Sequence, residues 1–256
     1  MNLNDNKKYL KEIIRTISEE MNINPVFIEK DYYVSMLLKE IFNRDPNFVF
    51  KGGTSLSKCY KIIDRFSEDI DLNYDYNGTI PSISKRSSIN KVIEESIESL
   101  NLIKKYPVPV WTKRNFLRYK VEYNKNYNDV SYIKPDVQIE TAFFLDSNPT
   151  KKKKMQSMIG EYLIDIGRED IVKEYGLEEF EVTVQSLERT FVDKCLAICD
   201  YVVSKRIKEH SRHLYDLHKI YPNISFDDEM NLLFKTIIKK RNDNKIGYQY
   251  DVQMKI

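Results

Sequence analysis

An adjacent glycine pair stands at positions 52 and 53, in a chain with only seven glycines among 256 residues. The pair follows a short β-type run at residues 48–50 and precedes a helical pattern. Because Gly52 and Gly53 lack side chains, their backbone can approach a ligand closely. The unpaired N–H groups at the start of a helix attract phosphate, and Thr54 and Ser55 add hydroxyl donors. The pattern predicts a phosphate-binding turn.

Two aspartates, Asp69 and Asp71, lie two positions apart in an alternating segment that predicts a strand over residues 69–74. Both carboxylates therefore leave the same face of that strand. Carboxylates side by side repel each other unless a divalent cation lies between them. A third carboxylate, Asp136, lies in a strand predicted over residues 134–140, and Glu140 on the same face is the reserve candidate for its role.

A phosphate-binding turn beside a carboxylate pair is the combination that metal-assisted nucleotidyl transfer requires. Two Mg²⁺ ions, about 3.5–4 Å apart, would bridge the carboxylates and the triphosphate of an NTP substrate. They would activate an attacking hydroxyl and stabilise the leaving pyrophosphate. We therefore predict that Asp69, Asp71 and Asp136 are catalytic metal ligands, and that Gly52 to Ser55 bind the nucleotide.

Each of these features also has a simpler interpretation. A glycine pair can form an ordinary tight turn, and paired aspartates often belong to a solvated strand face. Lys120, in a strand predicted between the two acidic strands, could contact phosphate as a point charge or join a cross-strand charge ladder. The four lysines at 151–154 predict a solvated loop, or alternatively a contact with RNA phosphates.

The order of predicted elements is helices, then mixed strands and helices, then helices, which indicates an α/β core with helical flanks. Residues 1–46 form the N-terminal helical segment, where Asn24 and Pro25 are typical of a helix start. Residues 47–150 form the core with a small mixed sheet, and residues 151–256 form a mostly helical C-terminal region. A short last strand near residue 183 and a helix opening at Ser186 belong to that region.

The composition is that of a globular protein without a strong charge bias. Lys and Arg number 41 and Asp and Glu number 39, so the net charge of +2 excludes a bulk polycation but allows a local basic groove. No stretch approaches the roughly 18 apolar residues that a membrane helix needs. Three cysteines, an odd and small number, fit a reducing cytoplasm, and neither they nor the three histidines show the spacing of a metal site.

The segments 51–56 (Lys-Gly-Gly-Thr-Ser-Leu) and 65–72 (Arg-Phe-Ser-Glu-Asp-Ile-Asp-Leu) together resemble the signature of the AbiEii/AbiGii toxin family. These are nucleotidyltransferase-fold toxins of bacterial toxin–antitoxin and abortive-infection systems. The resemblance continues at residues 28–32 (Ile-Glu-Lys-Asp-Tyr), 133–137, 187–197 and 212–217. In the last of these, His213 replaces an aspartate of the family pattern, so Asp216 is the better match.

The resemblance implies a nucleotidyltransferase-like core and further site residues. Lys194 would be an active-site cation, with Asp193 and Asp216 close to it. The activity implied is transfer of a nucleotide from an NTP to an RNA acceptor, for which tRNA is the acceptor we favour, and a neighbouring antitoxin is expected. A non-catalytic NTP-binding module and a kinase-like phosphotransferase on the same fold remain the alternatives.

Overall fold

The structure is a computed structural model that describes residues 2–76, 81–105, 116–127, 133–143, 146–205 and 211–246. Its helical elements are η1 (Leu3–Asp5), α1 (Lys7–Met21), α2 (Pro25–Arg44), α3 (Gly52–Lys58), α4 (Ile83–Ser99), α5 (Met158–Asp165), α6 (Glu169–Glu174), α7 (Leu187–Val203), α8 (Ser211–Ile220), η3 (Tyr221–Asn223) and α9 (Asp228–Asp243). Its strands are β1 (Phe48–Lys51), β2 (Ile70–Tyr74), β3 (Ile103–Lys105), β4 (Phe116–Glu122), β5 (Val137–Ala142), β6 (Thr150–Met155) and β7 (Phe180–Gln185).

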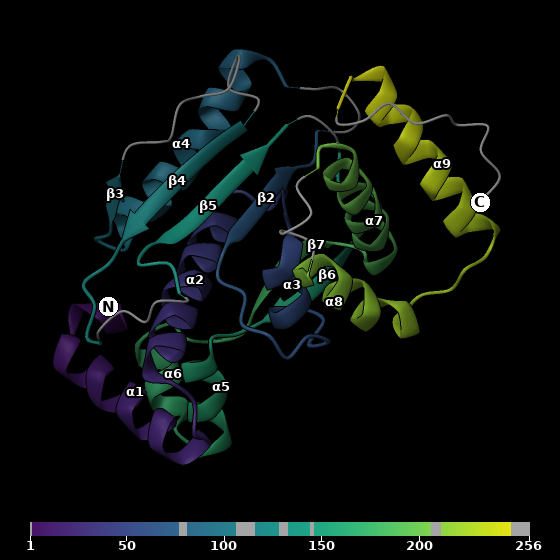
Figure 1. Cartoon of the computed structure of the whole chain (residues 1–256). Coiled ribbons are helices and arrows are strands. Elements are labelled where there is room, and N and C mark those ends of the chain that lie inside the picture. Colours follow the sequence, from purple (N-terminus) through teal and green to yellow (C-terminus); the bar gives the residue numbers. More distant parts are fainter. Residues whose placement is uncertain are drawn as a thin grey trace.

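The strands described form one mixed sheet in the order β3-β4-β5-β2-β1-β7-β6. β2 runs parallel to β5, and β1 runs parallel to β7, while the other neighbouring pairs are antiparallel. Figure 1 shows α1, α5 and α6 grouped at one corner of the molecule and α7, α8 and α9 grouped on another side. The predicted α/β fold with N-terminal helices and a helical C-terminal region is confirmed in outline.

On β4 and β5 the sheet has one apolar face and one polar face, because side chains alternate along a strand. On β4 and β5 the buried positions, including Leu117, Tyr119 and Ile139, join the main hydrophobic core. Helix α2 contributes a long row of buried apolar residues to the same core, among them Leu37 and Ile41. The alternate positions on these strands are polar and half-buried. The chemistry-bearing residues are thus left on the face opposite the core.

Local sequence explains where the helices that flank the sheet begin. The Asn24 side chain accepts a hydrogen bond from the Val26 N–H at 3.0 Å, and Pro25 occupies the first turn of α2. The Ser186 hydroxyl accepts from the Arg189 N–H at 3.2 Å and starts α7. Both starts agree with the prediction, since a side-chain acceptor at this position satisfies an N–H that the helix leaves unpaired.

The four lysines at 151–154 do not form the predicted loop but lie in β6, the edge strand of the sheet. Lys151, Lys152 and Lys154 pair with Glu188, Glu181 and Glu179 at 3.7, 3.3 and 3.0 Å. Lys153 lies over the ring of Tyr60. Charged side chains on an edge strand hinder its pairing with a strand of another chain. The four lysines therefore protect this edge of the sheet from such pairing.

β6 and β7 join the same sheet as β1 to β5, so the sheet extends beyond the proposed core boundary at residue 150. The C-terminal helices nonetheless have apolar contacts of their own, between α7 and α9 through Val192, Leu196 and Ile237. A second small cluster joins Leu56 of α3 to Ile220 of α8. No helix in the described part of the chain is long and apolar enough to cross a membrane.

Candidate active site

The two glycines between β1 and α3 are pressed against charged side chains. Gly52 has a φ of +78°, and a Cβ built there would lie 2.0 Å from Oδ2 of Asp71. At Gly53 a Cβ would lie 2.5 Å from Nη2 of Arg65 and 2.7 Å from Oγ of Ser67. A side chain at either position would therefore force a carboxylate, a guanidinium or a hydroxyl to shift, and at Gly52 the positive φ favours glycine as well.

The hydroxyls of Thr54 and Ser55 are buried in the turn itself. Thr54 donates to Oγ of Ser67 at 3.0 Å, and Ser55 donates to the carbonyl oxygen of Gly52 at 2.8 Å. Both residues are almost fully buried. In this structure the two hydroxyls hold the shape of the turn, so phosphate binding by these side chains stays a prediction.

Asp71 lies at the centre of the polar sheet face. Its position on β2 pairs with Lys51 on β1 and with Glu140 on β5. Burial raises the pKa of the Asp71 carboxyl to about 6; Glu140 and Asp69 add to the rise, while Lys51 and Lys194 oppose it. The charged form of the Asp71 carboxyl is therefore disfavoured, chiefly because the group is buried.

Asp69 lies on the same face, one residue before β2 begins. Its Oδ2 accepts from Nζ of Lys134 at 2.5 Å, and the same ammonium donates to Oε1 of Gln138 at 3.1 Å. Oδ1 of Asp69 is buried and has no hydrogen-bond partner among the residues that the structure describes. One oxygen of this carboxylate is thus left for another ligand.

Asp136 and Glu140, the two candidates for a third carboxylate, occupy different places. Glu140 is in register with Asp71 on the neighbouring strand and forms an ion pair with Arg118 at 2.7 Å. Asp136 comes just before β5 begins, is buried, and its Oδ1 has no hydrogen-bond partner in the described part of the chain. The sheet register places the reserve candidate, Glu140, beside Asp71.

Asp216 of α8 joins the C-terminal helices to the glycine turn. It is fully buried, and its two oxygens accept from Nε and Nη2 of Arg65 at 2.8 and 2.7 Å. Nζ of Lys194 on α7 donates to the same carboxylate at 2.7 Å. Burial alone would raise the pKa of Asp216, but the bonds from Arg65 and Lys194 outweigh it and hold that pKa below its usual value. Because Arg65 lies against Gly53, Lys194 is connected to the glycine turn through Asp216, and its role as an active-site cation stays a prediction.

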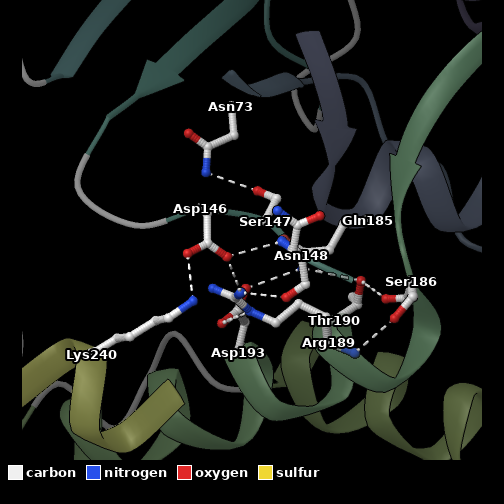
Figure 2. Close-up of polar contacts among 10 residues, drawn as sticks. All are labelled: Asn73, Asp146, Ser147, Asn148, Gln185, Ser186, Arg189, Thr190, Asp193 and Lys240. Carbon is white, nitrogen blue, oxygen red and sulfur yellow. Dashed lines mark hydrogen bonds and ion pairs between the residues drawn. The ribbon is translucent and has the colours of Figure 1, made fainter. Parts of the chain in front are cut away.

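Asp193, although adjacent to Lys194, belongs to a separate network. Neighbouring helix positions point about 100° apart, and Asp193 accepts from Nε2 of Gln185 at 3.0 Å and Nε of Arg189 at 3.1 Å. Figure 2 shows this network, in which Arg189 also bonds the carbonyl of Asn148 and Asp146 pairs with Lys240 of α9. It fastens α7 and α9 to the segment after β5, and in this structure Asp193 has a supporting place.

Lys120 lies on the polar face two strands away from β2. It is opposite Gln138 on β5 and Lys105 on β3, and no ion-pair partner is found for it within the described residues. The sheet order puts β5 and β2 between Lys120 and the glycine turn at the end of β1. Lys120 is therefore placed on the side of the carboxylates that faces away from that turn.

The site also contains residues that the sequence interpretation did not include. Lys51 and Arg65 flank the glycine turn, and Lys134 holds Asp69. Arg65 could have been suspected from its place in the 65–72 segment, but its partner Asp216 is 151 positions away. Only the folded chain reveals that contact.

The residues around Asp71 fit a divalent cation that is shared with a bound nucleotide. No group of three or more acidic, histidine or cysteine side chains in the described ranges could by itself hold a metal. Mg²⁺, however, is commonly held by one or two carboxylates together with substrate phosphates. Asp69 offers a buried oxygen that has no hydrogen-bond partner among the described residues, and burial disfavours the charged form of the Asp71 carboxyl. Both observations favour a cation that arrives with the NTP.

A first prediction concerns Gly52, where an added methyl group would collide with Asp71. We expect Gly52→Ala to lower nucleotide transfer more than tenfold, because the Asp71 carboxylate must move, and to cost about 1–3 kcal/mol of stability from the strained backbone. Gly167→Ala is the matched control: its φ is +74° and nothing lies within 4 Å of its added Cβ. Equal loss of activity in both variants would contradict the steric argument; thermal melts and transfer assays measure the two effects.

Comparisons with known proteins find similarity to nucleotidyltransferases. A family model described as "Nucleotidyl transferase AbiEii toxin, Type IV TA system" matches residues 37–253. Among solved structures, MenT4, a nucleotidyltransferase toxin from Mycobacterium tuberculosis H37Rv, is similar with a TM-score of 0.53 and 19% identity, covering 86% of this chain and 67% of that chain. A protein described as a nucleotidyltransferase from H. pylori has a TM-score of 0.48 and 18% identity, and the match covers 88% of this chain and 80% of that chain. A search of curated protein sequences finds no match. The likeness to MenT4 shows a shared fold.

Proposed function

Because the chain belongs to the AbiEii nucleotidyl transferase toxin family, we propose that it is an Mg²⁺-dependent toxin that transfers a nucleotide from an NTP to the end of an RNA. The favoured acceptor is tRNA, whose modification would halt translation and growth. We place the protein in the cytoplasm, as part of a toxin–antitoxin or phage-defence system with a cognate antitoxin. The observation that carries the proposal is the sheet register that sets Asp71 between Lys51 of the glycine turn and Glu140.

On this proposal the triphosphate lies against the glycine turn. Arg65 and Lys194 stand next to that turn, and Asp216 fixes both of them with short hydrogen bonds. Lys51 adds a third positive charge close to Asp71. Fixed cations around a triphosphate stabilise the charge that develops as pyrophosphate leaves.

Asp69 and Asp71 would hold the metal, and the predicted third ligand is Asp136, with Glu140 as the alternative that lies closer to Asp71. When bound, Mg²⁺ supplies Lewis-acid polarisation of the phosphate oxygens and neutralises charge. An acceptor hydroxyl oxygen forms the new bond to the α-phosphorus, the bond to pyrophosphate breaks, and the hydroxyl proton passes to a carboxylate of the site or to solvent water. The family pattern would count Asp193 in this site, and we assign it the supporting role of fixing α7.

The position of Lys120 supports the proposal that the RNA acceptor approaches the site from the β4 side of the sheet. It lies beyond β5, away from the glycine turn, and is not paired with an acidic residue among those described. A lysine in that position can bind an RNA phosphate as a point charge. The lysines of β6 are less suited to RNA, because three of them already pair with glutamates.

The direct test is a labelling experiment with purified protein, total tRNA, Mg²⁺ and each of the four NTPs. We expect label from the α-phosphate to enter the RNA, and we expect EDTA to abolish its incorporation. Incorporation from the γ-phosphate instead would overturn nucleotidyl transfer in favour of a kinase-like reaction. Tight NTP binding without incorporation of any label would favour a non-catalytic binding module.

A further inference from the structure

Lys30, a lysine of α2 outside the site described above, is completely buried. Its ammonium donates to the carbonyl oxygen of Asp136 at 2.6 Å and to that of Lys134, and it lies 3.0 Å from Oε2 of Glu68. Two backbone carbonyl oxygens therefore accept hydrogen bonds from this ammonium, and a carboxylate forms an ion pair with it. Burial lowers the pKa of Lys30, while Glu68, Asp136 and Asp69 favour its charged form.

The acceptors of Lys30 come from two segments that each lead into a strand of the site. Glu68 lies two residues before β2 begins and next to Asp69, whereas residues 134 and 136 lie three residues and one residue before β5 begins. Oε1 of Glu68 also accepts from the N–H of Lys134 at 3.2 Å, which closes the network between the two segments. β2 and β5 are the parallel neighbours whose register sets Glu140 beside Asp71. A shift by one residue would turn every side chain of a strand to the other face.

The residues on either side of Lys30 contact other segments of the fold. Oε1 of Glu29 accepts from the N–H and the side-chain amide of Asn126, both at 2.8 Å, and so fixes the segment after β4. Asp31 pairs with Lys58, the last residue of α3, and accepts from the N–H of Met158 at 2.7 Å. Because consecutive side chains point in different directions around a helix, one turn of α2 reaches five separate segments, at residues 58, 68, 126, 134–136 and 158.

We propose that Lys30 is a positioning residue for nucleotidyl transfer: its buried ammonium holds together the segments that lead into β2 and β5 and thereby fixes Asp69 and Asp71 relative to the third carboxylate, Asp136 or Glu140. The inference rests on the proposed function. Lys30 touches neither nucleotide nor acceptor and acts through the strands that it holds. Groups that orient metal ligands typically change metal affinity by about 10–100-fold when they are removed.

The test measures Mn²⁺ binding to the full chain by electron paramagnetic resonance, with a non-hydrolysable NTP analogue present and no turnover. We expect Lys30→Met to weaken Mn²⁺ binding about tenfold or more, and to lower the transfer rate per folded molecule without weakening binding of the analogue alone. The matched control is Lys39→Met, a lysine of the same helix that bonds the carbonyl of Gly176 at 2.7 Å and pairs with Glu178 at 3.3 Å. This control should lose stability but keep wild-type Mn²⁺ affinity.

A purely structural role would predict that both variants lower only the folded fraction, and wild-type Mn²⁺ affinity in folded Lys30→Met would overturn the proposal. If that variant does not fold, Glu68→Gln keeps the shape of the partner and removes its charge, and it should weaken Mn²⁺ binding in the same direction. Wild-type affinity in folded Glu68→Gln would then overturn the proposal. Because Mn²⁺ binding is measured without turnover, failure of the RNA-labelling assay would count against the proposed function alone.

Discussion

Asp71→Asn is expected to lower nucleotide transfer strongly and, in the absence of metal, to make the protein more stable. A carboxylate that binds the metal contributes several kcal/mol to the transition state, and 1.36 kcal/mol corresponds to a factor of ten in rate, so transfer should fall about a thousandfold. The gain in stability follows from burial, which raises the pKa of Asp71 from 3.8 to about 6. At pH 7 the folded protein must hold this carboxyl charged, at a cost of up to about 3 kcal/mol that asparagine does not incur.

Asp69→Asn separates the two effects, because Asp69 already has an ion-pair partner in Lys134. It should lower transfer as strongly as Asp71→Asn but give no gain in stability. Urea unfolding in EDTA at pH 7 measures the stability of both variants, and α-phosphate labelling of tRNA measures transfer. An Asp71→Asn protein that is less stable than the wild type would show that burial does not disfavour the charged Asp71 carboxylate. Transfer at the wild-type rate would exclude Asp71 as a metal ligand.

The parts of this site that the sequence predicts are those whose geometry is local. The alternation of Asp69, Ile70, Asp71 and Leu72 is enough to predict a strand with both carboxylates on one face, because side-chain direction has a period of two. Asn24 and Ser186 mark helix starts through hydrogen bonds that span only two or three residues. The close approach at the glycine turn is likewise predicted by the absence of side chains.

The parts that sequence interpretation missed depend on tertiary structure. Spacing shows that Asp136 and Glu140 share a face, but only the register between β2 and β5 decides which of them lies beside Asp71. The lysines at 151–154 predict a loop by their charge, yet glutamates from β7 and its surroundings allow them to form an edge strand. These contacts join segments far apart along the chain, so no local pattern specifies them.

Asp216→Asn is expected to be the most destabilising single substitution in the site. The Asp216 carboxylate is the shared partner of Arg65 and Lys194, whose side chains are themselves largely buried. Removing one member of a buried ion-pair network leaves uncompensated charge and costs about 3–5 kcal/mol. Transfer should fall as well, because Lys194 and Arg65 lose the contact that holds them beside the glycine turn.

The pH dependence of stability gives this prediction a second readout. The folded pKa of Asp216 is lowered from 3.8, so its stabilising contribution is present above pH 3.8 and is lost as the pH falls through the folded value. The difference in unfolding free energy between wild type and Asp216→Asn should therefore shrink as the pH falls below about 4.

Asp64→Asn is the matched control: Asp64 precedes Arg65 and pairs with Lys219 of the same helix α8 at 2.7 Å, but its side chain is exposed. Exposed pairs contribute little because water screens them, so this control should unfold like the wild type. A loss of stability in Asp64→Asn as large as that in Asp216→Asn would mean that the contact between α8 and the 64–65 segment matters in general, and not the buried charge network.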